Sequence, residues 1–163
     1  MCIRDSLAYR TIAMNTQGMS HEDSIRQPSP GGNCANWILG HVTRVQNQIM
    51  ELLEEAPAWD SEALERTARP ITTEAEAIDW DAMRREFLAS EERCLAAIER
   101  LSDEKLDEPG YPNPLGGEMR YGELLNFLGF HQCYHAGQIG MSRRLAGLDG
   151  VIRGPQERAA AGA

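Results

Sequence analysis

The chain has 163 residues, with 25 acidic and 16 basic side chains, a formal net charge of −9 and 42% hydrophobic residues. This length and apolar content suit one globular domain that buries a core without disulfide staples, and they exclude wholesale disorder. No apolar run reaches the roughly 18–20 residues of a membrane span, and the net acidity argues against nucleic-acid binding, which needs cationic side chains.

Residues 1–6 carry both an acid and a base where a secretory signal would be apolar, so we expect a cytoplasmic protein. The same hexamer fits poorly with the sequence that follows, and we expect it to be a non-native scar. The four cysteines form no Cys-x-x-Cys pair, which predicts free thiols, mostly buried, rather than a zinc ribbon or a redox motif.

Four segments have apolar residues at the spacing of an amphipathic helix. They cover residues 7–19, 34–54, 80–101 and 121–146. Asn33 is the expected N-cap of the second helix, and Gly147 is the expected stop of the last one, whose final turn carries Arg143 and Arg144. The first segment is much shorter than its partners, which suggests that the native N-terminus is missing.

Two long connections join the later helices, from 56 to 78 and from 102 to 120. Asp60 and Thr73 are expected to cap short helical turns in the first connection, and Thr73 with Glu76 matches a capping box. No segment alternates in the way of a strand. The sequence therefore predicts an all-α protein: a four-helix bundle of residues 7–152, in up-down-down-up or a related order, with a flexible tail at 153–163.

Three of the four histidines lie on the inward faces of two predicted helices. His131 and His135 are four residues apart, so both imidazoles lie on one face of the last helix. His41 shares its face with apolar residues three before it and four after it, whereas His21 lies in a polar stretch and is expected to be solvated. Burying an imidazole without a partner costs on the order of 1–3 kcal/mol, and a metal ion that binds all three would remove this cost.

Two interpretations of this pattern remain open. The histidines could be core residues bonded to carbonyl groups, or they could hold one divalent transition metal, with zinc preferred and nickel or iron as alternatives. Three protein ligands would leave a coordination position open, as in catalytic zinc sites. The metalloprotease motif is absent because Gln132 follows the first histidine of the pair, and Cys133 lies on the other face of the helix.

Two short sequence signatures extend beyond the histidines. Residues 122–125 (GELL) and 131–139 (HQCYHAGQI), followed by 143–147 (RRLAG), resemble the last helix of the DinB/YfiT-like superfamily. That helix typically reads GELL, then H-x-x-YH-x-GQI, then RLLG. Residues 36–41 (NWILGH) are similar to the second-helix signature of the same superfamily, Trp-x-x-Gly-His. The resemblance extends over residues 7–147.

The resemblance implies a four-helix bundle that holds one divalent metal through His41, His131 and His135, and it implies frequent homodimers. Characterised members include thiol-dependent S-transferases and a mycothiol-dependent maleylpyruvate isomerase, in which the metal activates a low-molecular-weight thiol. We therefore expect a thiol and a small electrophile as partners, and neither nucleic acid nor a membrane. A non-catalytic metal-binding, structural or stress-related bundle protein is the alternative.

Several residues beside the histidines have two interpretations each. Gln138 and Tyr134 could line a pocket or support the metal ligands, or they could be a surface amide and a packing residue. Asn36 and Trp37 could line the mouth of the site, although Trp37 also suits the core. No general acid lies near the three histidines in sequence, so no catalytic residue is predicted beyond the metal site.

Overall fold

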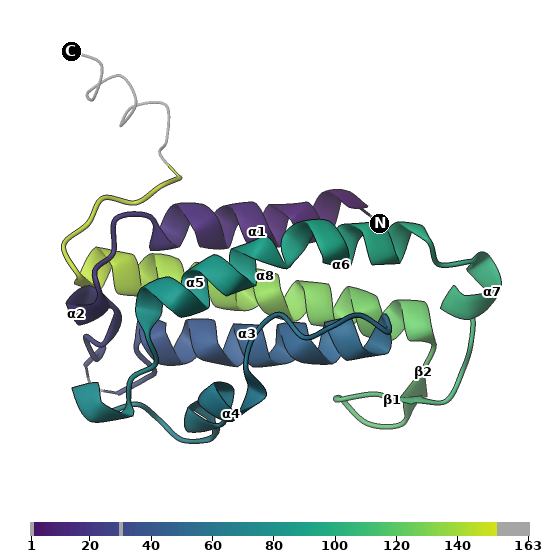
Figure 1. Cartoon of the computed structure of the whole chain (residues 1–163), viewed down its shortest axis with the longest axis horizontal. Coiled ribbons are helices and arrows are strands. Elements are labelled where there is room, and N and C mark those ends of the chain that lie inside the picture. The colour runs from purple at the N-terminus through teal and green to yellow at the C-terminus, as the bar shows by residue number, and fades with distance from the viewer. Residues whose placement is uncertain (1, 30, 153–163) are drawn as a thin grey trace, which may run out of the picture.

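The computed structural model describes residues 2–29 and 31–152, with side chains from residue 7 onward. The tail expected at 153–163 lies outside the described residues. The bundle consists of α1 (Cys2–Thr16), α3 (Ala35–Leu52), the consecutive helices α5 (Trp80–Ala89) and α6 (Glu91–Glu99), and α8 (Tyr121–Leu145). In Figure 1, α1 and α8 run in one direction, while α3 and the α5–α6 pair run in the other. The prediction of an all-α bundle in up-down-down-up order is therefore confirmed.

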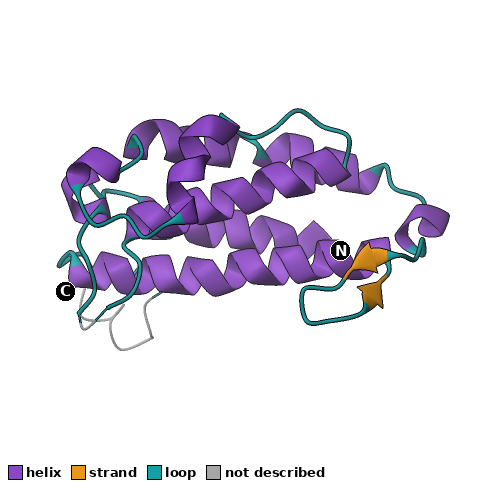
Figure 2. Cartoon of the chain, turned by 90° about the horizontal axis from the view of Figure 1, so that it is seen from below, coloured by secondary structure: helices purple, strands orange, loops and turns teal. Residues whose placement is uncertain are grey.

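Each of the four helical columns, with α5 and α6 taken as one, packs against two neighbouring columns. The last helix, α8, packs against both α1 and α3, while α6 packs on α1 and α5 packs on α3. These contacts close the bundle, because they join the four helical columns in a ring. The view of Figure 2 shows the helices lying along a common direction, with the connection before α8 at one end.

The first helix differs from its predicted bounds of 7–19. It begins at Cys2 and spans 15 residues, so it is nearly as long as α3, with 18 residues, but it remains much shorter than α8, with 25. It ends at Thr16 because Gly18 adopts a φ of 73°, a left-handed conformation that stops a helix. Ser20 then caps a separate short helix, α2 (His21–Ser24), in a capping box with Asp23.

The predicted third helix is divided at Ser90, and it ends at Glu99 rather than at residue 101. The buried Ser90 hydroxyl donates to the carbonyl of Phe87 at 2.7 Å. A serine side chain that bonds to the preceding turn competes with the regular helical ladder, which accounts for the break between α5 and α6. The break lies against α1, where the Tyr9 hydroxyl is 3.5 Å from Ser90 Oγ.

Helices α3 and α8 are both followed by a residue in a left-handed backbone conformation, Glu54 after α3 and Gly147 after α8. Helix α3 is capped by Cys34, without a side-chain bond, rather than by the expected Asn33. It ends two residues earlier than predicted, because Glu54 adopts a left-handed φ of 58°. Gly147 plays the same part after α8 with a φ of 84°, and Leu148 N donates back to Arg143 O at 3.2 Å. The helix stop predicted at Gly147 is confirmed.

The connections contain more regular structure than the sequence indicated. The first holds α4 (Ser61–Leu64), η1 (Glu65–Ala68) and η2 (Glu74–Glu76), and the predicted caps at Asp60 and Thr73 are confirmed. The second holds α7 (Asp103–Leu106) and an antiparallel pair of two-residue strands, β1 (Tyr111–Pro112) and β2 (Glu118–Met119). The expectation of no strands is therefore wrong at this hairpin, whose strands are too short to show alternation.

One face of α3 holds the first connection in place, and we call it the connection face: Asn36, Gly40 and Asn47. Spacings of four and eleven residues place these side chains on one side of a helix. The Asn36 amide accepts from Ile78 N at 2.9 Å and donates to Ile78 O at 2.8 Å. The Asn47 amide accepts from Ala58 N at 2.7 Å and donates to the Trp59 carbonyl at 2.9 Å.

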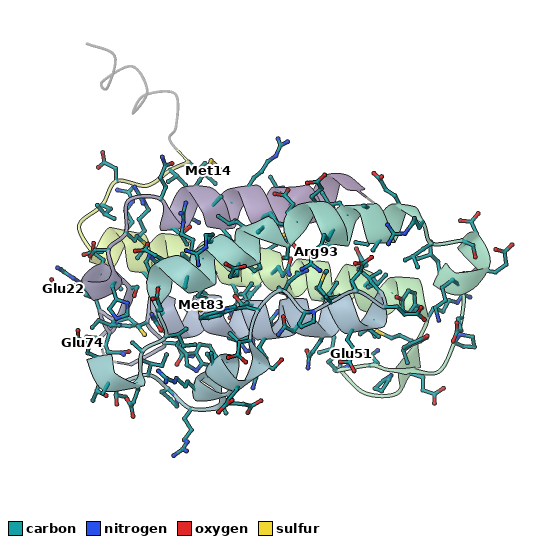
Figure 3. The ribbon with its side chains drawn as sticks, viewed as in Figure 1. Met14, Glu22, Glu51, Glu74, Met83 and Arg93 are labelled. Carbon is teal, nitrogen blue, oxygen red and sulfur yellow. The ribbon has the colours of Figure 1, made fainter. Side chains whose placement is uncertain are left out.

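Gly40 lies between the two asparagines on this face, and side chains of the connection approach the helix closely at this position. A Cβ at this position would lie 2.5 Å from Thr67 Cγ2 and 3.0 Å from Ile78 Cδ1, so any larger residue would force its neighbours to shift. A second helix of the bundle also holds the connection. Arg93 on α6, labelled in Figure 3, donates to the carbonyl of Ala56 at 3.0 Å. The connection is thus held by hydrogen bonds from two helices of the bundle.

The hydrophobic core has two large clusters along the bundle axis. One contains Val42 and Ala136, and the other contains Val45 and Leu128. Near the boundary of the two clusters lie polar residues of α3 and α8, which we call the polar layer: His41, Gln46, His131, Gln132 and His135. Both glutamines are buried, and Gln132 Nε2 donates to Gln46 Oε1 at 2.6 Å.

Candidate metal centre

The three inward histidines meet within the polar layer, where the neighbouring helices α3 and α8 run antiparallel. His41 Nε2 lies 3.0 Å from His131 Nε2, and His131 Nε2 lies 3.1 Å from His135 Nε2. One ligand nitrogen from each ring lies within 4.8 Å of the others. Residues one helical turn apart on α8 supply two of the rings, and α3 supplies the third. The prediction that these histidines come together is confirmed, and they could hold a metal ion.

All three imidazoles are held in the neutral form that metal binding requires. Burial lowers the pKa of His41 to about 4, with a further contribution from the neighbouring His135, His131 and Arg44. Burial and the proximity of His135 lower the pKa of His131 to about 4. Burial also lowers the pKa of His135, although the hydrogen bond that this ring donates to Gln138 acts in the opposite direction. Metal-binding nitrogens must carry a free lone pair, so these shifts reduce competition from protons.

Hydrogen bonding alone does not satisfy the three rings. His135 Nδ1 lies 2.7 Å from Gln138 Oε1. Because an amide oxygen only accepts hydrogen bonds, Nδ1 must carry the proton and donate it. Nε2 of the neutral His135 ring is therefore unprotonated and has a free lone pair. A neutral His131 has one N–H, so at most one of its two contacts to other imidazoles is a well-aligned hydrogen bond. Within the described residues, Nδ1 of His41 and of His131 is buried without a hydrogen-bond partner.

The arrangement fits a metal ion in its donor set and in its dimensions. A divalent cation accepts the lone pair of each Nε2, which removes the repulsion between bare nitrogens at close range. Tetrahedral zinc with Zn–N distances of about 2.0–2.1 Å separates its nitrogen ligands by about 3.4 Å. The two observed separations of 3.0 and 3.1 Å are within a few tenths of an ångström of this value.

Aromatic rings enclose part of the histidine cluster. Trp37 stacks on His41, with ring centroids 5.0 Å apart and an angle of 10° between the planes. Tyr134 contacts His135 edge to face at 5.2 Å, and more than half of the Tyr134 side chain is exposed. Trp37 also packs against the hydrophobic core, which agrees with both interpretations of this residue.

Asn36 serves the fold rather than the site. Its amide is buried and pairs with the main chain of Ile78, so it is not free to line the mouth of the centre. His21 begins α2, is partly buried rather than fully solvated, and does not join the cluster. Cys133 is exposed and does not join the cluster either. Among the residues whose side chains are described, Cys34, Cys94 and Cys133 form no disulfide bond.

Sequence reasoning missed the rest of the polar layer. Gln46 and Gln132 are as deeply buried as the surrounding apolar residues, and Gln46 Nε2 has no hydrogen-bond partner in the described part of the chain. Their positions inside two apolar helix faces were a signal for this layer, because an uncharged amide there must find a partner. Gly40 was likewise part of a motif without a stated role, and the close approach of Thr67 supplies one.

With this geometry in place, the comparisons with known proteins decide the family. A family model described as the DinB superfamily matches residues 7–139. The chain belongs to the DinB superfamily. Its fold is similar to the crystal structure of a conserved protein from Enterococcus faecalis, with 17% sequence identity, a TM-score of 0.66 and coverage of 88% of this chain and 92% of the other. That likeness concerns the DinB fold alone.

No curated protein matches the sequence of this DinB protein. In the described part of the chain, no helix is both long enough and apolar enough to cross a membrane. Superfamily membership and the cluster of three histidines together fit a metal-binding DinB-like protein.

Proposed function

We propose that this protein binds one divalent transition metal through Nε2 of His41, His131 and His135, and that it uses the metal to activate a low-molecular-weight thiol. The convergence of the three Nε2 atoms carries the proposal, with contacts of 3.0 and 3.1 Å that cannot all be hydrogen bonds. Three imidazoles favour zinc, nickel or iron over calcium or magnesium, and zinc is our first choice.

The proposed activity is that of a thiol-dependent S-transferase or isomerase. A bound zinc-type cation promotes deprotonation of a coordinated thiol or water and leaves a position open for it. In the transfer, the thiol sulfur forms a bond to an electrophilic carbon of the second substrate, the thiol proton passes to solvent, and the leaving group departs with its electron pair. In the isomerisation, the sulfur adds to a double bond and leaves again after rotation.

The residues of the chain have limited roles in this scheme. The three histidines hold the site, and the rings of Trp37 and Tyr134 restrict the approach to His41 and His135. No carboxylate joins the cluster within the described residues. The chemistry is therefore assigned to the metal and the thiol, with no separate general acid.

We also propose a cytoplasmic homodimer. Cys34, Cys94 and Cys133 form no disulfide bond with one another, which suits a reducing compartment. On α8, four large apolar side chains at helical spacing are each more than half exposed: Phe130, Tyr134, Met141 and Leu145. A two-fold axis would place this stripe against the same stripe of a second copy, as in isologous dimers.

The dimer is tested by sedimentation of the wild type and of Met141→Lys. We expect the wild type to sediment as a dimer and the variant as a monomer. Leu115→Lys is the matched control, because Leu115 is an exposed apolar residue in the turn between β1 and β2 rather than on α8. A monomeric wild type, or equal effects of the two substitutions, would contradict the dimer.

The activity is tested with purified protein loaded with zinc, nickel or iron. Glutathione, cysteine, bacillithiol and mycothiol are each offered with a generic electrophile, and the loss of free thiol is measured. We expect metal-dependent turnover by the wild type and by His21→Ala, and none by His131→Ala. Stoichiometric metal without turnover, together with a large fall in melting temperature on chelation, would instead support the non-catalytic structural protein.

A further inference from the structure

His135 differs from His41 and His131 in that its Nδ1 atom has a hydrogen-bond partner. His135 Nδ1 is 2.7 Å from Gln138 Oε1, one turn further along α8. Nδ1 of His41 and of His131 has no hydrogen-bond partner among the described residues. The side chain of Gln138 therefore determines the tautomer of a single ring.

This contact decides which nitrogen of His135 faces the cluster with a lone pair. The amide oxygen accepts the proton of Nδ1, which leaves Nε2 bare and directed toward His131 Nε2 at 3.1 Å. If the amide were turned so that its NH₂ group faced the ring, Nδ1 would accept and Nε2 would carry the proton. A protonated Nε2 cannot bind a metal ion, so the orientation of the Gln138 amide matters for the site.

Gln138 is held by its surroundings without being part of the hydrophobic core. Its main-chain carbonyl accepts from Ser142 Oγ at 3.2 Å. Its side chain borders a cavity of about 200 Å³, whose other walls include Pro28, Ile38 and Met141. A side chain of similar length can therefore replace Gln138 without displacing core residues, which makes this contact accessible to substitution.

We propose that Gln138 is a positioning residue that holds His135 in the Nδ1–H tautomer, with Nε2 bare and directed into the cluster. Its value for metal affinity rests on the proposed function, whereas the tautomer itself is a property of the metal-free protein. Groups that orient metal-binding histidines in this way contribute about 10–100-fold to metal affinity.

The test uses three variants of the full chain. Gln138→Met keeps the length of the side chain and removes the acceptor, and Gln138→Glu keeps an acceptor oxygen. Gln48→Met is the matched control, since Gln48 is exposed on α3. Long-range ¹H–¹⁵N NMR of the metal-free proteins reports the tautomer of His135, and competition with a chelating dye gives the zinc dissociation constant.

We expect the Nδ1–H tautomer in the wild type and in Gln138→Glu, and a mixture in Gln138→Met. The zinc dissociation constant should rise about 10–100-fold in Gln138→Met, and it should stay near the wild-type value in Gln138→Glu and Gln48→Met. An Nε2–H tautomer in the wild type, or a Gln138→Met variant that matches Gln48→Met in both measurements, would overturn the inference. If the tautomer follows Gln138 but the wild type binds no zinc, the positioning stands and the proposed function fails.

Discussion

The connection face of α3 and the polar layer between α3 and α8 differ in how completely their polar groups are paired in hydrogen bonds. On the connection face, the Asn36 amide pairs with both main-chain groups of Ile78, at 2.8 and 2.9 Å. In the polar layer, the Nε2 atoms of His41 and His131 face each other at 3.0 Å, and Nδ1 of each has no partner within the described residues. Both regions include residues of α3, and Asn36 and His41 are only five positions apart on it.

We take this difference to separate residues that build the fold from residues that we propose to bind a metal ion. Buried polar groups that serve the fold are nearly always paired inside the protein, and leaving one unpaired costs about 1–3 kcal/mol. The connection face follows this rule, whereas the histidine cluster does not. Stability should therefore depend strongly on Asn36, and ligand binding should depend on the histidines.

The largest expected effect on stability comes from Asn36→Ala. The substitution leaves the N–H and C=O of Ile78 buried without partners, so we expect a loss of about 3 kcal/mol in the free energy of unfolding. Urea denaturation of the metal-free protein measures it. Below the unfolding transition the variant should still bind zinc with wild-type stoichiometry. Wild-type stability in this variant would remove the contrast between the two regions.

A smaller effect is expected from Gly40→Ala, which adds a methyl group to the connection face. The new Cβ would lie 2.5 Å from Thr67 Cγ2, and the resulting overpacking should cost about 2 kcal/mol. Gly137→Ala on α8 is the control, because nothing lies within 4 Å of its added Cβ. That control should gain about 1 kcal/mol, since alanine is the better helix former. Thermal unfolding of both variants should show opposite signs.

The smallest effect concerns the polar layer and depends on pH. His41 and His131 have an ordinary pKa of 6.5 in the unfolded chain and a pKa of about 4 in the folded, metal-free protein. Between these values the unfolded chain binds more protons, so the free energy of unfolding falls as the pH drops from 6.5 toward 4. Partial solvent contact of the rings limits the loss to about 1 kcal/mol.

Urea denaturation at pH 7 and pH 5 in the presence of a chelator measures this loss. The double variant His41→Ala/His131→Ala should lose less stability over the same interval, because it lacks the two groups. An equal pH dependence in both proteins would show that the rings titrate normally in the folded state.

The fold was predictable from the sequence where apolar spacing alone decides it. The periodicity of residues 34–54 and 121–146 identified α3 and α8 to within two residues. Ser90 was not identifiable as a break, because its effect comes from a hydroxyl bonded to Phe87 in a buried setting. The end of α3 was misplaced because Glu54 adopts a conformation that usually requires glycine.

The histidine cluster was predictable because the spacing of His131 and His135 fixes their common face, and His41 lies on an apolar face of its own helix. The role of Asn36 was not predictable, since its partner Ile78 lies 42 residues away in an irregular connection. The bond between Gln138 and His135 could be suggested from a spacing of three residues, but the direction of the amide needed the structure.

The most direct test of the central claim is the zinc content and zinc affinity of the purified protein. Calorimetric titration of the metal-free wild type and of His21→Ala should show one zinc ion per chain, and His135→Ala should lose this binding while it remains folded. At a zinc concentration of about 1,000 times the dissociation constant, the wild type should gain about 4 kcal/mol in the free energy of unfolding. Unchanged zinc binding in His135→Ala, or no binding by the wild type, would contradict the account.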